Sequence, residues 1–504
     1  MRAAELFERV ERMLGAGGAY ASLVPGWRDS PEQREYARRV CTLLAERNAP
    51  SADHRAALAT LEASTGIGKS IGYLTPLMIY AQATGRRVAV ATYTLDLLRA
   101  LETTVLPLVA RAIELDSAEP APRFSVRVGM REFVSHQRCQ ALLDTLTDQD
   151  PAKAPLRALC AFADGANAGT TTGRFRDWLE AGYRLPQGVS VEAICLRPWV
   201  DVDDHAAYRR QSERAGDADL LLTTQSTILM HCIKRIDVLG ASEDFPAVDA
   251  VVIDEADAVA GMAESVSQAY VPLHLLQRQL ALHDTGKRKA IAAARADLER
   301  AIEHLAGNCS ASGRALANQR SETHLAQGYR LGMAAAHAGI KALSALQEVK
   351  SQPEQLARLD YWRRDLSGIE RVFDGHGTGS SAYVDKTPVR GLVGIGVASV
   401  DPGRVLGALW RRPVDEGGVR AVLMTSATLV PPGERGMAYF HREVGIDISQ
   451  HRFIAGASGQ IEPQQYGSMR FVFADPRGAK PFTPSVGDAG DVEPQFNADW
   501  IRYA

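Results

Sequence analysis

The sequence has few cysteines, no long apolar run and almost no excess of charge. Its six cysteines, among 504 residues, are scattered without a C-x-x-C pair, which fits free thiols in a reducing cytoplasm. No apolar run reaches about 18 residues, so no membrane-spanning helix is predicted. The N-terminal stretch 1–14 is charged and amphipathic, unlike a signal peptide. We therefore expect a cytoplasmic location and no membrane partner.

The net charge of −3 excludes a basic field over the whole surface, so a nucleic-acid site must be a local groove. Hydrophobic residues make up 46% of the chain and charged residues 23%, as in an ordinary globular protein. A chain of 504 residues is too long for one core and predicts roughly three or four domains.

The clearest motif is a loop rich in small residues between a predicted strand (56–61) and a predicted helix (71–81). It consists of Ser64, Thr65, Gly66, Ile67, Gly68, Lys69 and Ser70. Glycines let backbone N–H groups close around phosphate oxygens, and a helix N-terminus adds partial positive charge. Lys69 can reach the β- and γ-phosphates, and the Ser70 hydroxyl can bind Mg²⁺. The alternative is a chance glycine turn, since Ala63 replaces the first glycine of G-x-x-x-x-G-K-[ST].

A second motif is the apolar run 250–253, followed by Asp254, Glu255 and Asp257. A continuous apolar run predicts a buried parallel strand, and ligand sites of α/β folds lie at the C-terminal ends of such strands. Asp254 is placed to hold Mg²⁺ through water, and Glu255 to orient and deprotonate the attacking water. A core strand ending in solvated acids is the commoner explanation where no phosphate loop exists. Together with Lys69, the run predicts an α/β nucleotide hydrolase with a parallel sheet.

Weaker signals come from polar residues near these motifs. Gln33 follows Pro31 at the start of a helix, where its amide can read an adenine edge, or can merely be solvated. Thr92 and Thr94 follow the predicted strand 87–92, where hydroxyls suit the phosphates of a single strand, or simply reflect β-propensity.

Three further hydroxyls, Thr425, Ser426 and Thr428, follow the predicted strand 419–424. Ser426 and Thr428 can hydrogen-bond the acids of the 254–257 loop and so couple hydrolysis to movement. The alternative is that these hydroxyls cap the next helix.

The remaining segments divide the chain. Residues 117–216 are irregular, with three of the cysteines. Residues 258–400 carry apolar stripes at helical spacing, which predict a helical insert. The members of the two stripes are Ile291, Ala294, Leu298, Ile302 and Leu305, and Leu356, Leu359, Trp362, Leu366, Ile369 and Phe373. A flexible break is predicted at 375–381, a last strand at 469–474 and a Pro/Gly-rich linker at 475–494.

Residues 31–98, 218–257 and 401–475 resemble the DinG/XPD branch of superfamily 2 helicases. The segments that match are 62–70 (motif I, whose first position is Ala in this branch), 91–95 (motif Ia), 253–257 (motif II, with Asp257 where the branch usually has His) and 425–429 (motif III). Asp257 and Thr425 lie 168 residues apart, whereas DEAD-box proteins have only a short connection there.

The resemblance implies a RecA-like motor domain interrupted by two inserts. Its expected parts are motor domain 1 in pieces at 1–116, 217–257 and 401–474, a vestigial iron–sulfur-type insert at 117–216, a helical arch insert at 258–400, and the start of a truncated motor domain 2 at 475–504. No Q-x-x-G-R motif VI occurs, so the chain alone should bind nucleotide weakly and hydrolyse it poorly.

One departure from the family concerns metal. The segment 129–135 resembles the family segment that ends in the first cluster cysteine, but Ser135 stands at that position. Cys139, Cys160, Cys195 and Cys232 are scattered, and a cluster needs thiolate ligands, usually four. We therefore expect no iron–sulfur cluster, and the chain is most like the cluster-free DinG relatives found beside type IV CRISPR systems.

The resemblance implies an ATP- and Mg²⁺-dependent helicase that moves 5′ to 3′ on single-stranded DNA, with a CRISPR RNA-guided effector complex as an expected partner. In that reading Gln33 binds adenine, and the five hydroxyls named above touch DNA or couple it to hydrolysis. Two alternatives stay open: a DinG-like DNA repair helicase, and an ATP-gated adaptor that binds nucleic acid or an effector complex without unwinding.

Overall fold

The computed structural model divides the chain into two units, 1–461 and 462–504, which are described separately. The described residues are 3–46, 56–187, 189–196, 202–236, 246–284, 288–308, 315–317, 323–348, 362–363, 365–367, 369, 380–387, 392–399, 401–410, 419–431, 434, 436–462, 482–486 and 492–496.

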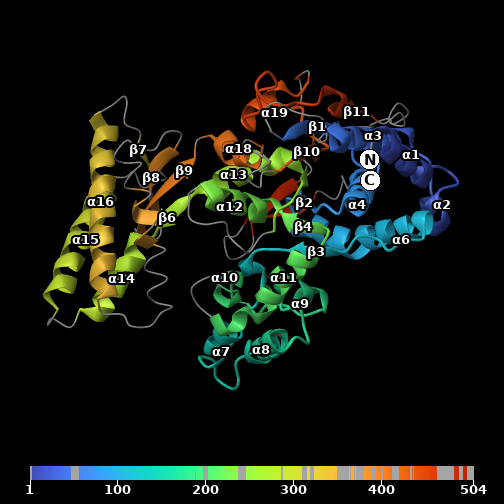
Figure 1. Cartoon of the computed structure of the whole chain (residues 1–504). Coiled ribbons are helices and arrows are strands. Elements are labelled where there is room, and N and C mark those ends of the chain that lie inside the picture. Colours follow the sequence, from blue (N-terminus) through green and yellow to red (C-terminus); the bar gives the residue numbers. More distant parts are fainter. Residues whose placement is uncertain are drawn as a thin grey trace. The chain divides into compact units, whose positions relative to one another are not determined.

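The first unit is organised around a seven-stranded parallel sheet with the order β11-β1-β10-β5-β2-β4-β3 (Figure 1). Its strands are β1 (Ala57–Ala63), β2 (Val88–Thr92), β3 (Phe124–Arg127), β4 (Leu220–Thr224), β5 (Ala250–Asp254), β10 (Ala421–Ser426) and β11 (Gly459–Ile461). The strands β2, β4, β5 and β10 are buried at every position, which explains their continuous apolar runs. The predicted α/β class is confirmed.

Helices cover both faces of this sheet. Along β1, Ala57, Ala59 and Leu61 pack into one cluster while Leu58 packs into the other, because successive strand residues point to opposite faces. The first cluster includes residues of α1 (Ala3–Leu14), α2 (Ala19–Leu23), α3 (Pro31–Glu46), α4 (Lys69–Thr84), α5 (Leu95–Ala100), η1 (Leu101–Val105) and α6 (Leu106–Ser117). The second includes residues of α12 (Gln225–Ile236), α13 (Val259–Ser267), α18 (Pro402–Trp410) and α19 (Ala438–Glu443).

The register of the sheet aligns the ends of the motif strands. Leu61 of β1 pairs with Thr425 of β10, and Thr425 pairs with Asp254 of β5. The loops that follow β1, β10 and β5 therefore leave the sheet at one edge, as expected for C-terminal ends of parallel strands.

The first insert differs from the sequence expectation at its start. Residues 124–127 form β3, the edge strand of the main sheet, although 117–216 is predicted to be an insert separate from the motor domain. This short strand pairs only with β4, and half of its positions are partly exposed, so it lacks the apolar run of its neighbours. The helices that follow are η2 (Met130–Glu132), α7 (His136–Leu143), α8 (Lys153–Ala168), α9 (Phe175–Glu180), α10 (Val191–Ile194), η3 (Val202–His205) and α11 (Ala206–Asp217).

Three cysteines that are far apart in sequence meet in this insert. Cys139, Cys160 and Cys195 lie in one buried apolar cluster with Trp178. Burial raises the pKa of the Cys139 thiol, and the nearby Cys160 and Cys195 raise it further. Within the described residues, no group of three or more His, Cys, Asp or Glu is arranged to hold a metal ion. The expectation of a cluster-free insert remains a prediction.

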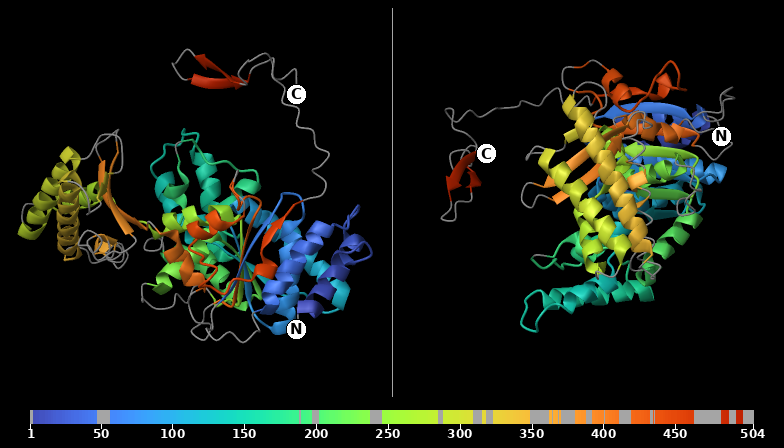
Figure 2. Two further views of the ribbon diagram at one scale, coloured as in Figure 1. Left: turned by 90° about the horizontal axis from the view of Figure 1, so that it is seen from above. Right: turned by 90° about the vertical axis from the view of Figure 1, so that its left-hand side faces the viewer.

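The second insert contains a sheet that the sequence pattern did not predict. Its helices α14 (Leu273–His283), α15 (Lys289–Asn308) and α16 (Thr323–Gln347) run side by side (Figures 1 and 2). They accompany an antiparallel sheet of order β6-β9-β8-β7, made of β6 (Ala269–Val271), β7 (Ala315–Ala317), β8 (Ser380–Thr387) and β9 (Leu392–Ser399).

Two glycines interrupt the apolar pattern of strand β9, so the sequence did not predict it. A Cβ at Gly394 would lie 2.1 Å from the Tyr270 hydroxyl, and one at Gly396 would lie 2.5 Å from the Tyr383 ring, so glycine is needed where these rings cross the strand. The stripe on α15 is confirmed as core, as are Trp362, Leu366 and Ile369 of the other stripe, whose remaining members lie outside the described residues.

The second unit contains an antiparallel hairpin of β12 (Phe482–Val486) and β13 (Val492–Phe496), where the sequence predicted a linker. The strand predicted at 469–474 lies outside the described residues, as does most of 375–381. Of the helices the structure describes, none has the length and apolar character needed to cross a bilayer.

Candidate nucleotide-binding site

The loop between β1 and α4 has the backbone that phosphate binding requires. Gly66 and Gly68 adopt φ angles of 85° and 83°, in the left-handed region that favours glycine. A Cβ built on Gly66 would meet nothing within 4 Å, so the loop is open there. No side chain caps the N-terminus of α4, which begins at Lys69. Its first N–H groups and the helix dipole therefore form a site suited to an anion.

Lys69 lies across the mouth of this loop. Its Nζ donates to the carbonyl oxygens of Ala63 (2.7 Å) and Ser64 (3.3 Å). Partial burial lowers the pKa of the Lys69 ammonium, while the carboxylates of Asp254, Asp257 and Glu62 oppose that shift. The lysine of the first motif and the acids of the second thus act on one another.

Asp254 is buried at the end of β5, with both oxygens engaged. Its Oδ2 accepts a hydrogen bond from the Tyr73 hydroxyl (2.8 Å), and its Oδ1 accepts one from the Glu255 N–H (2.9 Å). Burial raises the pKa of Asp254. Tyr73 also contacts the Ser70 hydroxyl, which links the two predicted Mg²⁺ ligands. Tyr73 was not singled out from the sequence, although its place three residues after Ser70 puts both on one helix face.

A second residue that the sequence did not reveal fixes the backbone of the acids. Gln225, completely buried at the end of β4, donates its Nε2 to the carbonyl oxygens of Asp254 (2.8 Å) and Glu255 (3.0 Å). Glu255 has a φ of 55°, a strained value for a residue with a side chain. Such strain persists where surrounding contacts over-determine it, and Gln225 supplies two of those contacts.

The Glu255 carboxylate faces the end of β2. Its Oε2 accepts hydrogen bonds from the Thr94 N–H (3.0 Å) and the Thr94 hydroxyl (3.2 Å). The Thr92 hydroxyl donates to the Thr94 carbonyl (3.0 Å), and the Thr92 side chain is fully buried. Tyr93, between them, is 47% exposed. The hydroxyls predicted to touch DNA are thus engaged inside the protein, and the exposed side chain is the tyrosine.

The expected contacts between the third motif and the acidic loop are present. Ser426 Oγ donates to Asp257 Oδ1 (2.5 Å), and Thr428 Oγ1 donates to Asp257 Oδ2 (3.0 Å). Thr425 is fully buried, where its hydroxyl donates to the Leu61 carbonyl (2.8 Å) and accepts from Tyr36 (2.9 Å). Thr425 therefore joins β10 to β1 from a buried position.

Gln33 lies against the phosphate loop. Helix α3 begins after Ser30, whose hydroxyl accepts from the Gln33 N–H (3.2 Å). The Gln33 side chain is 5% exposed, and its Nε2 donates to the Gly68 carbonyl (3.0 Å). A Cβ at Gly68 would lie 2.0 Å from that nitrogen, so this approach requires glycine. The Gln33 amide nitrogen therefore supports the loop.

We expect Gln33→Ala to weaken the binding of ATP and GTP by the same factor, because the lost bond supports the loop and does not select a base. A hydrogen bond of this kind contributes about 0.5–1.5 kcal/mol, or roughly a 2–10-fold change in affinity. Titration with fluorescent ATP and GTP analogues measures both constants. A loss much larger for ATP than for GTP would show instead that Gln33 reads adenine.

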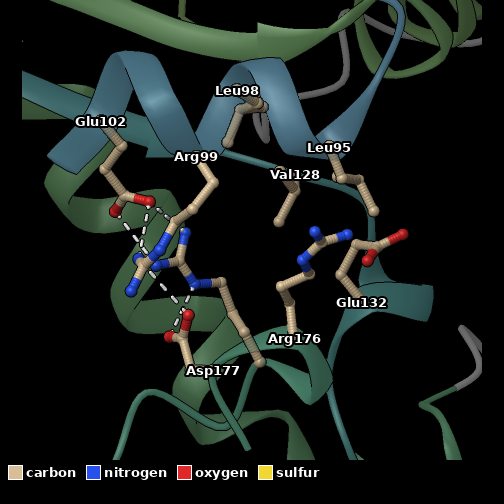
Figure 3. A pocket seen from close by; sticks show the side chains of 9 residues that line it. Leu95, Leu98, Arg99, Glu102, Val128, Glu132, Arg176 and Asp177 are labelled. Carbon is tan, nitrogen blue, oxygen red and sulfur yellow. Dashed lines mark hydrogen bonds and ion pairs between the residues drawn. The ribbon is translucent and has the colours of Figure 1, made fainter. Parts of the chain in front are cut away.

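Helix α5, which starts after Thr94, carries an ion-pair cluster that joins it to the first insert (Figure 3). Arg99 pairs with Asp177 (3.4 Å) and Glu180 (3.0 Å) of α9. Arg174 pairs with Glu102 (3.0 Å) and Asp177 (3.1 Å). The pocket between them is lined by three arginines and three acidic residues, so its formal charges balance.

Comparison with known proteins gives partial sequence matches to DinG helicases. No protein-family profile matches the chain. The ATP-dependent helicases DinG of Mycobacterium tuberculosis (strain ATCC 25177 / H37Ra) and Mycobacterium bovis (strain ATCC BAA-935 / AF2122/97) are each 30% identical to it over 224 residues. The match covers 42% of this chain and 32% of each relative, so it spans about a third of the length of these proteins.

Among solved structures, the chain is similar to Xpd4 of S. tokodaii, with a TM-score of 0.37 and 10% identity over 80% of this chain and 58% of that one. A likeness at that level identifies no function.

Proposed function

We propose that this chain binds ATP with Mg²⁺ at the loop 64–70 and hydrolyses it as a helicase or translocase on single-stranded DNA. The observation that carries the proposal is the convergence of Lys69, Ser70 and Asp254 at one edge of the parallel sheet. The partial similarity to the DinG helicases supports the choice of reaction.

The residues of the site fit the nucleotide. The open loop around Gly66 and the uncapped start of α4 would hold the phosphates, with Lys69 exchanging its loop carbonyls for phosphate oxygens. Ser70 and Asp254 would hold Mg²⁺, which neutralises charge on the β- and γ-phosphates when bound. Glu255 would take the proton of the attacking water.

Coupling to movement would run through the ends of β1 and β10. Asp257 is held by Ser426 and Thr428, as described above. Glu62, near the end of β1, accepts hydrogen bonds from the Val430 N–H (2.6 Å) and from Gln460 Nε2 (2.7 Å) of β11. A displacement of the acidic loop during hydrolysis would therefore be transmitted to segment 426–430 and to β11.

The finer expectations remain proposals that rest on the family resemblance. They are the domain assignments, the 5′ to 3′ direction, a strand-separating groove formed by the two inserts, the absence of an iron–sulfur cluster, and action beside a type IV CRISPR effector complex. DNA repair is the closest alternative role.

Lys69→Ala tests the motor. Because Lys69 supplies the positive charge of the loop, we expect the variant to lose ATP hydrolysis by about 100-fold or more, and to lose unwinding of a DNA fork with a single-stranded tail. Lys341→Ala is the matched control, since Lys341 pairs with Asp297 in the second insert. Equal unwinding by wild type and Lys69→Ala would contradict the helicase proposal. ATP binding without hydrolysis in the wild type would instead indicate an ATP-gated adaptor that does not unwind DNA.

A further inference from the structure

We infer that Thr94 holds the Glu255 carboxylate on the side away from the phosphate loop, and that single-stranded DNA stacking on Tyr93 releases it. Thr94 would then be a positioning residue that makes hydrolysis depend on nucleic acid. The inference rests on the proposed function and adds its regulation.

The contact between the two residues is specific. A single oxygen, Glu255 Oε2, accepts both the N–H and the hydroxyl of Thr94. The same hydroxyl accepts from the Leu97 N–H (3.3 Å) and so caps helix α5. The backbone of Glu255 is fixed by Gln225, so the side chain is the part free to move.

The order of strands decides the direction in which Glu255 points. Within the sheet the strands stand in the order β1-β10-β5-β2. Glu255 follows β5, which therefore has β10 on one side and β2 on the other. The phosphate loop follows β1, beyond β10. Asp257 is bonded to Ser426 at the β10 side, whereas Glu255 is bonded to Thr94 at the β2 side. The contact with Thr94 therefore keeps the Glu255 carboxylate on the far side of β5 from the phosphate loop.

Tyr93 is the point at which nucleic acid would act. It is 47% exposed between two threonines whose hydroxyls are both engaged internally. Exposed aromatic rings stack on the bases of single strands regardless of sequence. Because Thr92 and Thr94 are adjacent to Tyr93 and bonded to each other, a shift of the Tyr93 backbone displaces the donors of Thr94 from Glu255.

The same helix end is connected to the first insert. Thr94 caps α5, and Arg99 of α5 is paired with Asp177 of α9 (Figure 3). Arg99 is also paired with Glu180 of the same helix. A nucleic acid that moves this insert would therefore act on Thr94 as well. Two contacts with the DNA, one through Tyr93 and one through α9, would both act on the Glu255 carboxylate.

Thr94→Val tests the inference. Valine removes the hydroxyl and leaves only the backbone N–H to hold Glu255, so the restraint is weakened. We expect ATP turnover without DNA to rise about fivefold or more towards the rate that oligo(dT) gives the wild type, with KM for ATP unchanged. Thr94→Ser should keep the wild-type ratio of stimulated to basal turnover. Thr103→Val, which removes an exposed hydroxyl bonded to the Arg99 carbonyl, is the matched control.

Two further variants complete the test. One guards against destabilisation of α5 by valine, and the other tests the contact with DNA. Thr94→Asp keeps the α5 cap but repels the Glu255 carboxylate, so it should also raise basal turnover, even if valine destabilises α5. Tyr93→Ala should raise the oligo(dT) concentration that gives half-maximal stimulation by about tenfold.

The outcomes separate the inference from the proposed function. If Lys69→Ala loses turnover but neither Thr94→Val nor Thr94→Asp raises the basal rate, Thr94 does not restrain Glu255 and only the inference fails. If wild type and Lys69→Ala are alike, the proposed function fails with it.

Discussion

Replacing Glu255 with Gln should reduce ATP hydrolysis by about 10²–10⁴-fold, the contribution of a positioned general base, while leaving nucleotide affinity close to that of the wild type. The amide oxygen of glutamine can still accept both hydrogen bonds from Thr94, so the strained backbone and the loop keep their geometry. What is lost is a group that can take a proton from water. With binding intact and hydrolysis slow, the variant should remain on single-stranded DNA in the presence of ATP.

Single-turnover hydrolysis, fluorescent nucleotide binding and retention on an oligo(dT) resin measure these three properties. Glu264→Gln is the control, because Glu264 is an exposed residue of α13, just downstream of the acidic loop. Hydrolysis within about threefold of the wild type, a loss far below that of a general base, would remove Glu255 from the reaction.

Asp254→Asn should both abolish hydrolysis and stabilise the fold. The carboxylate is 4% exposed and its pKa is raised by burial, so the folded state binds the proton more tightly than the unfolded state does. Ionised Asp254 therefore costs stability at neutral pH. Asparagine removes the charge, and the Tyr73 hydroxyl can turn to accept from its amide. We expect a loss of about 100-fold or more in turnover and a rise in the unfolding temperature on the order of a few degrees.

The pH dependence gives the sign of this effect. As pH falls through the raised pKa, wild-type Asp254 takes up a proton and no longer destabilises the fold. The difference between the unfolding temperatures of wild type and Asp254→Asn should therefore shrink on acidification. Other carboxylates titrate in both proteins and cancel in the difference. Asp164→Asn, on the exposed face of α8, should not change the unfolding temperature at either pH. A variant less stable than wild type at neutral pH would mean that the two hydrogen bonds to the carboxylate outweigh its desolvation.

The sequence was sufficient for the parts of the site that are contiguous. The loop 64–70 and the acids after β5 each follow an apolar strand, so local pattern predicted both them and the edge of the sheet where they meet. Tyr73 and Gln225 were missed because nothing local marks them: Tyr73 lies 181 residues from Asp254, and Gln225 lies 29 residues before it. Their roles depend on which strands become neighbours.

Dependence on neighbours that are distant in sequence also explains where the other predictions differ from the structure. Thr92 and Thr94 sit where hydroxyls were predicted, but the sequence did not show that Glu255, 161 residues further on, would accept the bonds of Thr94. Strand β9 was hidden by glycines that admit Tyr270 and Tyr383, and the meeting of Cys139, Cys160 and Cys195 depends on helix packing that residue spacing does not encode.

The position of β1 between β10 and β11 has a consequence for synthesis of the protein. Leu61 and Thr425, joined across the sheet, are 364 residues apart in the chain. At ribosomal rates of about 5–20 residues per second, β1 emerges about 20–70 s before the strand that flanks it on that side. During that interval its backbone is an open template for pairing with other chains. Helper proteins that shield nascent chains should therefore raise the yield of this protein.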